Sequence, residues 1–447
     1  MEKNLTERSL FGTMITFAVP YLISCFLQTF YGMADLFFAG KFNGAATITA
    51  VATGSQVIHM LTVIIAGLAM GSTVSIAQAV GARNKERTSR AIGNSITVFV
   101  IFTAVATVLL LLLVAPIVGA VQTPAESVTE AQQYLRVCFI GVPFIVAYNV
   151  ISSIFRGLGD SRSPMIFVGI AGVINMILDY ILMGPFAMGA RGAAIATMTS
   201  QAISVCIALF ALGRFSMGVS LSRRDLWPDR DLGAMILKIG IPVACQDGFI
   251  QISFLVITAI ANSRGTTMAA SVGIVEKIIS FLFLVNSAML STISAIAAQS
   301  LGAGKRDRAR EVLFLGMRIT FVYGLAVIAI CELFAPQILS LFVKDDAMVV
   351  VLGAGYLRAY VFDTVFAGMH FSFSGYFCAC ERSILSFIHN TISILAVRIP
   401  GAYLASVLWP ATLVPMGIAT AAGSFVSVVI CVIMFLGLEK KQKGVNI

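Results

Sequence analysis

Runs of about 20 apolar residues recur along the whole chain, and this feature limits the fold more than any other. A helix needs about 20 residues to cross about 30 Å of hydrocarbon. Only 11% of the 447 residues are charged and 58% are hydrophobic, whereas a soluble domain carries roughly 25% charged residues. Hydrocarbon offers no hydrogen-bond partners, so each run should be a helix. The sequence therefore predicts an all-α polytopic membrane protein with twelve spans, at about 12–40, 50–76, 92–120, 129–155, 164–185, 193–214, 234–262, 268–297, 312–338, 349–377, 384–407 and 412–436.

Lysine and arginine are unevenly distributed among the loops between these spans. With the N-terminus inside, the loops near 83–90, 223–230 and 305–310 and the C-terminal tail carry most of the cationic residues. The positive-inside rule then places both termini in the cytoplasm. We expect a multi-pass protein of the cell inner (plasma) membrane, in contact with the lipid bilayer. This distribution accounts for the net charge of +9 without a nucleic-acid partner.

The second half of the sequence echoes the first at a spacing near 222 residues. Tyr134-Leu135-Arg136 recurs as Tyr356-Leu357-Arg358, and Pro20 recurs as Pro242. QAVGARNKERTSRA (78–91) likewise resembles QSLGAGKRDRAR (299–310). The repeat predicts two six-helix bundles: an N-terminal lobe at 1–220, a cytoplasmic linker at 221–232 and a C-terminal lobe at 233–447. Six is an even number, so both bundles run in the same direction, related by a pseudo-two-fold along the membrane normal, as in many secondary transporters.

A few carboxylates remain inside the predicted spans. Between Arg8 and Lys41 the only charged side chain is Asp35. A carboxylate at the bilayer centre costs about 2.5–3.5 kcal/mol, so such residues are candidates for function. The alternative is a structural hydrogen bond, or an ion pair with Lys277 or Arg398. The full set is Asp35, Asp179, Asp247, Glu276 and Asp363.

Asp35 and Asp179 have further polar residues at helical spacing. Asn175 and Asp179 are four residues apart and share one face of a helix. Gln28, Tyr31 and Asp35 form a polar stripe on the first span. Two carboxylates with amide, hydroxyl and phenol oxygens can hold a proton or a hard cation such as Na⁺. Two carboxyl groups that share one site also titrate as a pair.

Three segments near these residues resemble the multidrug and toxic compound extrusion (MATE) transporters. They are RGLGDSRSPM (156–165), NMILDYILMG (175–184) and RGAAIATMTS (191–200). PYLISCFLQTFYGMADLFFAG (20–40) is similar to the first helix of that family. The resemblance covers essentially the whole chain, and we assign it to the branch that includes DNA-damage-inducible protein F.

The resemblance implies roles for individual residues. It implies that Asp35, Asn175, Asp179 and Thr197 bind the coupling cation, which includes a possible Na⁺ site. It also implies a bend of the first helix at Pro20, where proline removes one backbone hydrogen bond. We assign Gln28, Tyr31 and Asn149 to the substrate cavity.

The second lobe matches the family only in part. Asp363 resembles an aspartate of the tenth helix in the sodium-coupled branch. Where that branch has a glutamate on the seventh helix, this chain has Ile250 or Gln251, and Asp247 lies about one turn away. Asp247, Glu276 and Asp363 are therefore the second-lobe candidates, ranked below the first-lobe site.

The sequence analysis favours a secondary active antiporter. We expect it to export organic, lipophilic or cationic compounds in exchange for H⁺ or Na⁺, as a monomer and without a cofactor. No nucleophile–base pair, metal-binding motif or Walker motif is present, so we expect no enzyme activity. A flippase for lipid-linked saccharides would need cationic residues in its cavity to hold phosphates. An ion channel is the alternative from a different class.

Overall fold

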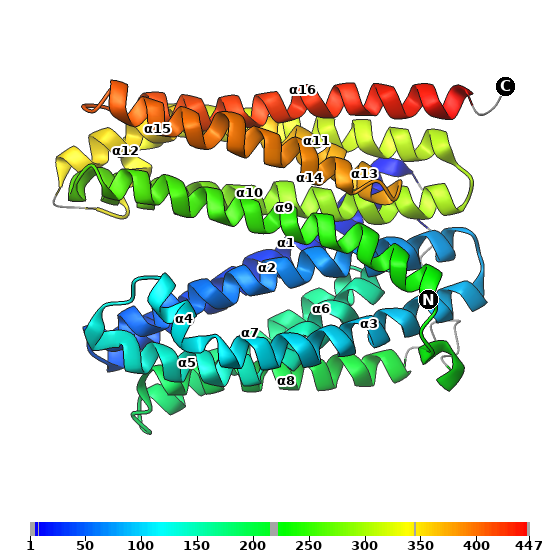
Figure 1. Ribbon diagram of the computed structural model, residues 1–447, viewed down its shortest axis with the longest axis horizontal. Helices are drawn as coiled ribbons and strands as arrows, with labels where there is room; N and C mark the ends of the chain where they lie inside the picture. The colour runs from blue at the N-terminus through cyan, green and yellow to red at the C-terminus, as the bar shows by residue number, and fades with distance from the viewer. Residues whose placement is uncertain (1–4, 8, 215–221, 344–345, 445–447) are drawn as a thin grey trace. The chain divides into compact units, whose positions relative to one another are not determined.

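The computed structural model describes residues 5–7, 9–214, 222–343 and 346–444, and helices make up nearly all of this part (Figure 1). Packing divides the chain into two compact units: Met1–Gly240 with Gly302–Gly304, and Ile241–Leu301 with Lys305–Ile447. The division along the chain therefore falls inside a helix, after Gly240. The lobe boundaries expected from the repeat stay a prediction, and the expected linker starts at a residue outside the described part.

The first half of the chain forms eight α-helices in the described residues. They are α1 (Leu10–Phe42), α2 (Ala45–Gly81), α3 (Lys85–Leu112), α4 (Val114–Ala120), α5 (Val128–Ile140), α6 (Val142–Gly157), α7 (Arg162–Met183) and α8 (Gly189–Arg214). Short 3₁₀ turns η1 (Ala125–Ser127) and η2 (Arg223–Leu226) precede α5 and α9.

The second half of the described residues also forms eight α-helices. They are α9 (Arg230–Asn262), α10 (Thr266–Gly302), α11 (Arg306–Ser340), α12 (Ala347–Tyr360), α13 (Asp363–Ala379), α14 (Ile384–Ser393), α15 (Ile399–Leu408) and α16 (Val414–Gly444). A π-helical turn, η3 (Ile394–Arg398), joins α14 to α15.

These helices confirm the predicted membrane fold. Eleven helical segments of the described residues are long and apolar enough to span a bilayer, and a bent pair raises the number to 12. Two of the eleven join consecutive helices, at Ala347–Ala379 and Ile384–Leu408. The bent pair is α5 with η1 (Ala125–Ile140) and α6, which meet at 48°. The span predicted at 92–120 is divided between α3 and α4. It begins earlier than expected because the Asn84 side chain caps α3 by accepting a hydrogen bond from the Arg87 N–H at 2.9 Å.

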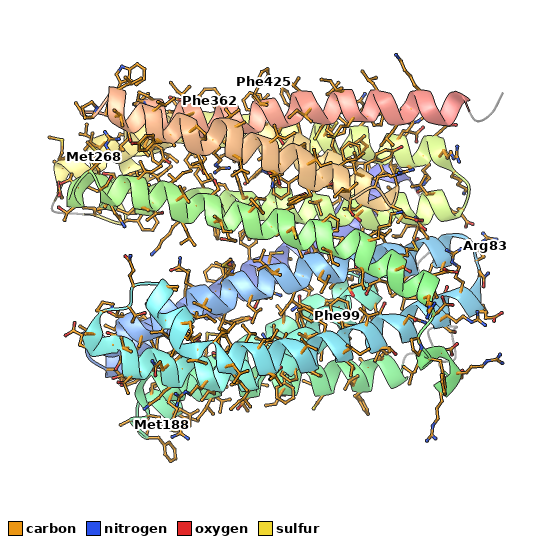
Figure 2. The ribbon with its side chains drawn as sticks, viewed as in Figure 1. Arg83, Phe99, Met188, Met268, Phe362 and Phe425 are labelled. Carbon is orange, nitrogen blue, oxygen red and sulfur yellow. The ribbon has the colours of Figure 1, made fainter. Side chains whose placement is uncertain are left out.

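The distribution of polarity is that of a protein in hydrocarbon. Large apolar side chains cover the outside of the helices, as Phe362 and Phe425 show in Figure 2, with exposed fractions of 44% and 51%. Polar side chains such as Asp35, Asp179 and Asp363 are buried. Because lipid is as apolar as these outer side chains, burial of polar groups decides where each helix faces.

A glycine sets the distance between α2 and α5. Tyr134 of α5 is 1% exposed and its ring lies on Gly54 of α2. A Cβ atom at position 54 would lie 2.2 Å from Tyr134 Cδ1. The Tyr134 hydroxyl also shares a hydrogen bond of 3.0 Å with Ser55. Any side chain at position 54 would therefore force the two helices apart.

Gly54→Ala should destabilise the protein by about 1–3 kcal/mol, the usual cost of overpacking. This corresponds to a fall of about 1–3 °C in the unfolding midpoint in detergent. Gly40→Ala is the matched control, because a Cβ at this α1 position meets nothing within 4 Å. Equal midpoints for the two variants would contradict the packing argument.

Candidate cation site

Three helices of the first unit bring together the four residues to which we assigned the coupling cation. Asp35 lies on α1, Asn175 and Asp179 on α7, and Thr197 on α8. Thr197 Oγ1 donates to Asp35 Oδ2 at 3.0 Å, and Asn175 Nδ2 donates to Thr197 Oγ1 at 3.4 Å. The carboxyl groups of Asp35 and Asp179 interact directly. Helical spacing aligned the two α7 residues, and folding places α1 and α8 against them.

The Thr197 hydroxyl has two acceptors for its single proton. Asp35 Oδ2 and the Ala193 carbonyl oxygen both lie 3.0 Å from Thr197 Oγ1. The Ala193 carbonyl belongs to the preceding turn of the same helix. A change of charge on Asp35 can therefore redirect this hydroxyl without moving a helix.

Several oxygens in this cluster lack a hydrogen-bond donor. Among the described residues, no donor reaches Asp35 Oδ1, Asn175 Oδ1 or either oxygen of Asp179. Asp35 is 2% exposed, and both α7 residues are 0% exposed. Buried acceptors are normally paired, and a buried charge needs a counter-charge. Within the described part of the chain, no lysine or arginine forms an ion pair with either aspartate. A proton or a hard cation would supply the missing charge.

A second polar contact joins α1 to α8 one helical turn away. Gln201 Nε2 donates to the Tyr31 hydroxyl at 2.9 Å. Tyr31 precedes Asp35 by four residues, and Gln201 follows Thr197 by four, so the two contacts lie on the same pair of helix faces. The sequence analysis missed Gln201, although its spacing from Thr197 would have indicated it.

The residues assigned to the substrate cavity come from two helices, Gln28 and Tyr31 from α1 and Asn149 from α6. Gln28 interacts with the Tyr148 side chain. Asn149 Nδ2 donates to the Ile145 carbonyl of its own helix at 2.9 Å. Of these three residues, Tyr31 is the one joined to α8 of the cation cluster, through its hydrogen bond with Gln201. The cavity assignment stays a prediction.

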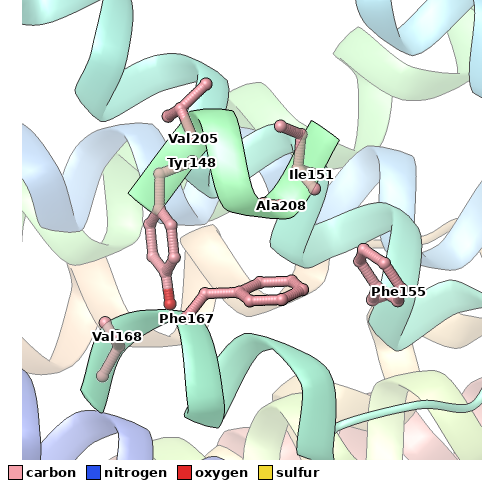
Figure 3. Close-up of a cluster of buried hydrophobic side chains, with 7 residues drawn as sticks. All are labelled: Tyr148, Ile151, Phe155, Phe167, Val168, Val205 and Ala208. Carbon is pink, nitrogen blue, oxygen red and sulfur yellow. The ribbon is translucent and has the colours of Figure 1, made fainter. Parts of the chain in front are cut away.

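An apolar cluster borders the site along α8 (Figure 3). Phe155 of α6 and Phe167 of α7 meet edge to face, with ring centroids 5.6 Å apart. Tyr31 and Leu27 of α1 pack against this cluster. The cluster consists of Tyr148, Ile151, Phe155, Phe167, Val168, Val205 and Ala208. Apolar surroundings of this kind strengthen electrostatic interactions at nearby carboxylates.

Two of the second-lobe candidates lie around an arginine. Arg398 Nη1 is 3.8 Å from Asp363 Oδ2, and the guanidinium also interacts with Glu276. Asp247 interacts with Cys378, and its role as a second-lobe candidate stays a prediction. The sequence analysis named Arg398 only as an alternative structural partner, and the structure places it against Asp363.

A family model described as MatE matches twice, over residues 20–181 and 242–404. The two matches start 222 residues apart (20 to 242), at the spacing of the internal repeat. The probable multidrug resistance protein YoeA of Bacillus subtilis is 26% identical, over 76% of this chain and 75% of its own length. The multidrug export protein MepA of Staphylococcus aureus (strain N315) is 23% identical over 89% of each chain.

Solved structures share the fold. A multidrug resistance MATE family transporter of the MOP superfamily, in an outward-facing conformation, has a TM-score of 0.90 at 23% identity, over 98% of this chain and 99% of that one. MATE in the bent conformation also has a TM-score of 0.90 at 23% identity, over 99% of this chain and 97% of that one.

The matched segments cover well over half of the chain, and its relatives are transporters rather than enzymes. The branch that includes DNA-damage-inducible protein F stays an expectation. The chain belongs to the MatE family of multidrug and toxic compound extrusion transporters.

Proposed function

We propose that this transporter exports organic, lipophilic or cationic solutes in exchange for H⁺ or Na⁺ bound between Asp35 and Asp179. The observation that carries the proposal is the pair of buried carboxylates with unpartnered oxygens, to which no cationic side chain of the described residues is bound. The relatives named above are multidrug export proteins, which supports the substrate class. We place the protein in the plasma membrane with both termini in the cytoplasm.

The hydrogen bonds suggest how cation binding changes the site. While Asp35 is charged, it is the stronger acceptor for the Thr197 proton, because hydrogen bonds to ionised groups are stronger than neutral ones. Once a cation neutralises the carboxylate, the Ala193 carbonyl competes for the same proton. The link between α1 and α8 then weakens, and α1 can shift.

Pro20 supplies a place for that shift. It lies inside α1, where it leaves the Thr16 carbonyl without the usual backbone donor. Ser24 Oγ donates to the Pro20 carbonyl at 3.1 Å, so a side chain also enters the hydrogen-bond ladder there. In the proposed cycle the outward-open protein takes up the cation, α1 shifts, and the solute leaves outward. The cation is then released inside.

The ion gradient is sufficient to drive this exchange. One charge that moves inward gains about 2.3 kcal/mol per 100 mV, and one pH unit adds about 1.4 kcal/mol per proton. The sum of about 3.7 kcal/mol supports a roughly 500-fold solute gradient per proton. No nucleotide is needed.

The alternatives predict different chemistry. A flippase for lipid-linked saccharides would hold phosphates with cationic side chains, whereas the first-lobe cluster is acidic. A channel would dissipate the ion gradient without a counter-substrate. Ion flux in proteoliposomes that depends on an exported drug excludes the channel.

Asp35→Asn and Asp179→Asn should each reduce ion-driven efflux to the level of vesicles without protein, because a neutral amide cannot exchange a cation. The measurement is efflux from drug-loaded proteoliposomes, with pH and sodium gradients imposed separately to identify the ion. Asp247→Asn is the matched control, since it removes a carboxylate outside this cluster. Full efflux by both first-lobe variants would remove these residues from the mechanism.

Thr197→Val should destabilise the protein by about 1–3 kcal/mol, because it leaves Asp35 Oδ2 without its donor in a buried place. The unfolding midpoint in detergent should fall by about 1–3 °C. Thr197→Ser keeps the hydroxyl and should retain the midpoint. An equal fall in both variants would show that the loss of the hydroxyl does not explain the effect.

Pro20→Ala should slow efflux roughly tenfold, which corresponds to about 1.4 kcal/mol, because the restored N–H completes the helix and stiffens α1. The initial efflux rate is the readout. Pro242→Ala is the matched control, since this proline lies at the repeated position inside α9. Unchanged efflux by Pro20→Ala would show that the proline is a fixed feature of the helix.

A further inference from the structure

The internal repeat allows the two lobes to be compared position by position. Two residues with positive φ, Gly159 and Glu381, follow α6 and α13 at a spacing of 222. Further along, Ile195-Ala196-Thr197 and Ile418-Ala419-Thr420 are 223 apart (197 to 420). The second lobe has therefore gained one residue in between.

The π-helical turn η3 is where the extra residue fits. A π-helix closes each hydrogen bond over one residue more than an α-helix, and such turns occur frequently at functional sites. The turn ends at Arg398. At the spacing of 223 that applies after this turn, Arg398 corresponds to Asn175 of the first lobe. An arginine thus takes the position of a neutral member of the cation cluster.

The carboxylates also occupy different positions of the repeat in the two lobes. At the same spacings, Asp35 and Asp179 correspond to Ile257 and Ala402, which carry no charge. The acidic residues of the second lobe come from other helices. Asp363 begins α13 and corresponds to Gly141 at 222. The cluster around Arg398 thus contains two carboxylates, Asp363 and Glu276. They lie on helices whose counterparts supply no carboxylate to the first-lobe cluster.

Glu276 is a second carboxylate of this cluster whose first-lobe counterpart is not acidic. Around α2 and α10 the spacing is 221, because Arg83 and Gly304, both with positive φ, end these helices at that distance. Glu276 then corresponds to Ser55, whose hydroxyl is bonded to Tyr134. In the second lobe Glu276 interacts with Tyr356, the counterpart of that tyrosine.

These side chains enclose the guanidinium of Arg398. Its side chain is 6% exposed and that of Asp363 is 0% exposed. Arg398 also donates to the Tyr360 hydroxyl, and its guanidinium lies over the Phe254 ring at 5.2 Å from the centroid. Thr258 Oγ1 donates to Glu276 Oε2 at 3.4 Å. Arg398 balances one of the two carboxylates, and a single proton is enough to balance the other.

The backbone nearby is adapted to an arginine. Gly423 of α16 faces Arg398, and a Cβ at position 423 would lie 3.0 Å from Arg398 Cβ. The first-lobe counterpart of Gly423 at 223 is Ser200. The loss of a side chain on α16 thus accompanies the gain of a large one on the facing turn.

We propose that Arg398 is a built-in cation that fills an oxygen-lined site of the second lobe, and that its removal would open this site to Na⁺ or K⁺. The oxygens without a donor among the described residues are both of Asp363, Glu276 Oε1 and the Tyr356 hydroxyl. Carboxylate and hydroxyl oxygens of this kind are ligands for hard cations. While the arginine is present, the second lobe holds no exchangeable metal cation.

The test uses the full-length protein in detergent, in an Asp35→Asn background that removes the first-lobe site. The unfolding midpoint is measured against NaCl, KCl and choline chloride at constant ionic strength, because a bound ion stabilises the folded state. Adding Arg398→Met should produce a saturable rise of the midpoint with Na⁺ or K⁺, at about tenfold lower concentration than any effect of choline. The Asp35→Asn parent and its Arg398→Lys derivative should show none.

A third substitution shows that the ion binds to this cluster. Adding Asp363→Asn to the Arg398→Met variant should abolish the rise of the midpoint with Na⁺ or K⁺. If the loss of the Arg398 charge alone prevents folding, Asp363→Asn should also restore expression, because it removes a carboxylate left without its counter-charge. The proposal is overturned if Arg398→Met gives no ion-specific rise, or if the variant folds neither alone nor with Asp363→Asn. It is also overturned if the parent already shows a rise that Asp363→Asn removes. Since the first-lobe site is absent throughout, none of these results depends on the proposed antiport mechanism.

Discussion

Hydrocarbon offers no hydrogen-bond partner to any polar group, and the rest of this structure depends on that constraint. Backbone groups are satisfied within helices, so the fold is a set of helices bounded by short turns. Each polar side chain inside the membrane must then find a partner within the protein. Charged side chains are far fewer there than uncharged polar ones. Asp35 and Asp179 lie together in the first lobe, and Glu276 and Asp363 lie beside Arg398 in the second. The scarcity of charged groups makes their grouping informative.

The same constraint explains what sequence analysis predicted. Apolar runs of fixed length indicated the spans, and the repeat indicated two related halves. Helical spacing aligned Asn175 with Asp179, because both lie on one helix. The contact of Thr197 with Asp35 joins residues 162 positions apart, and spacing within a helix cannot predict it. Only resemblance to a family suggested that pair, and Gln201, which the resemblance did not include, was missed.

The second lobe shows a different limit of sequence analysis. Asp363 matched a family position, but its partner Arg398 reaches it through a π-helical turn. One additional residue rotates the following helix by about 100°, so a spacing read as α-helical assigns the wrong face. The break between α12 and α13, which places Asp363 at a helix start, is equally hidden in a continuous apolar run.

Duplication gives both halves a related set of helices, but coupling transport to one ion requires only one half to bind that ion. A buried carboxylate without a counter-charge is costly, so a half that does not exchange an ion needs a permanent positive charge or no carboxylate. The second lobe carries Glu276 and Asp363 and has Arg398 beside them. An exchangeable ion leaves at each cycle, whereas a tethered guanidinium does not. In the proposed mechanism both lobes place a positive charge beside their buried carboxylates, and only the first lobe exchanges that charge during transport.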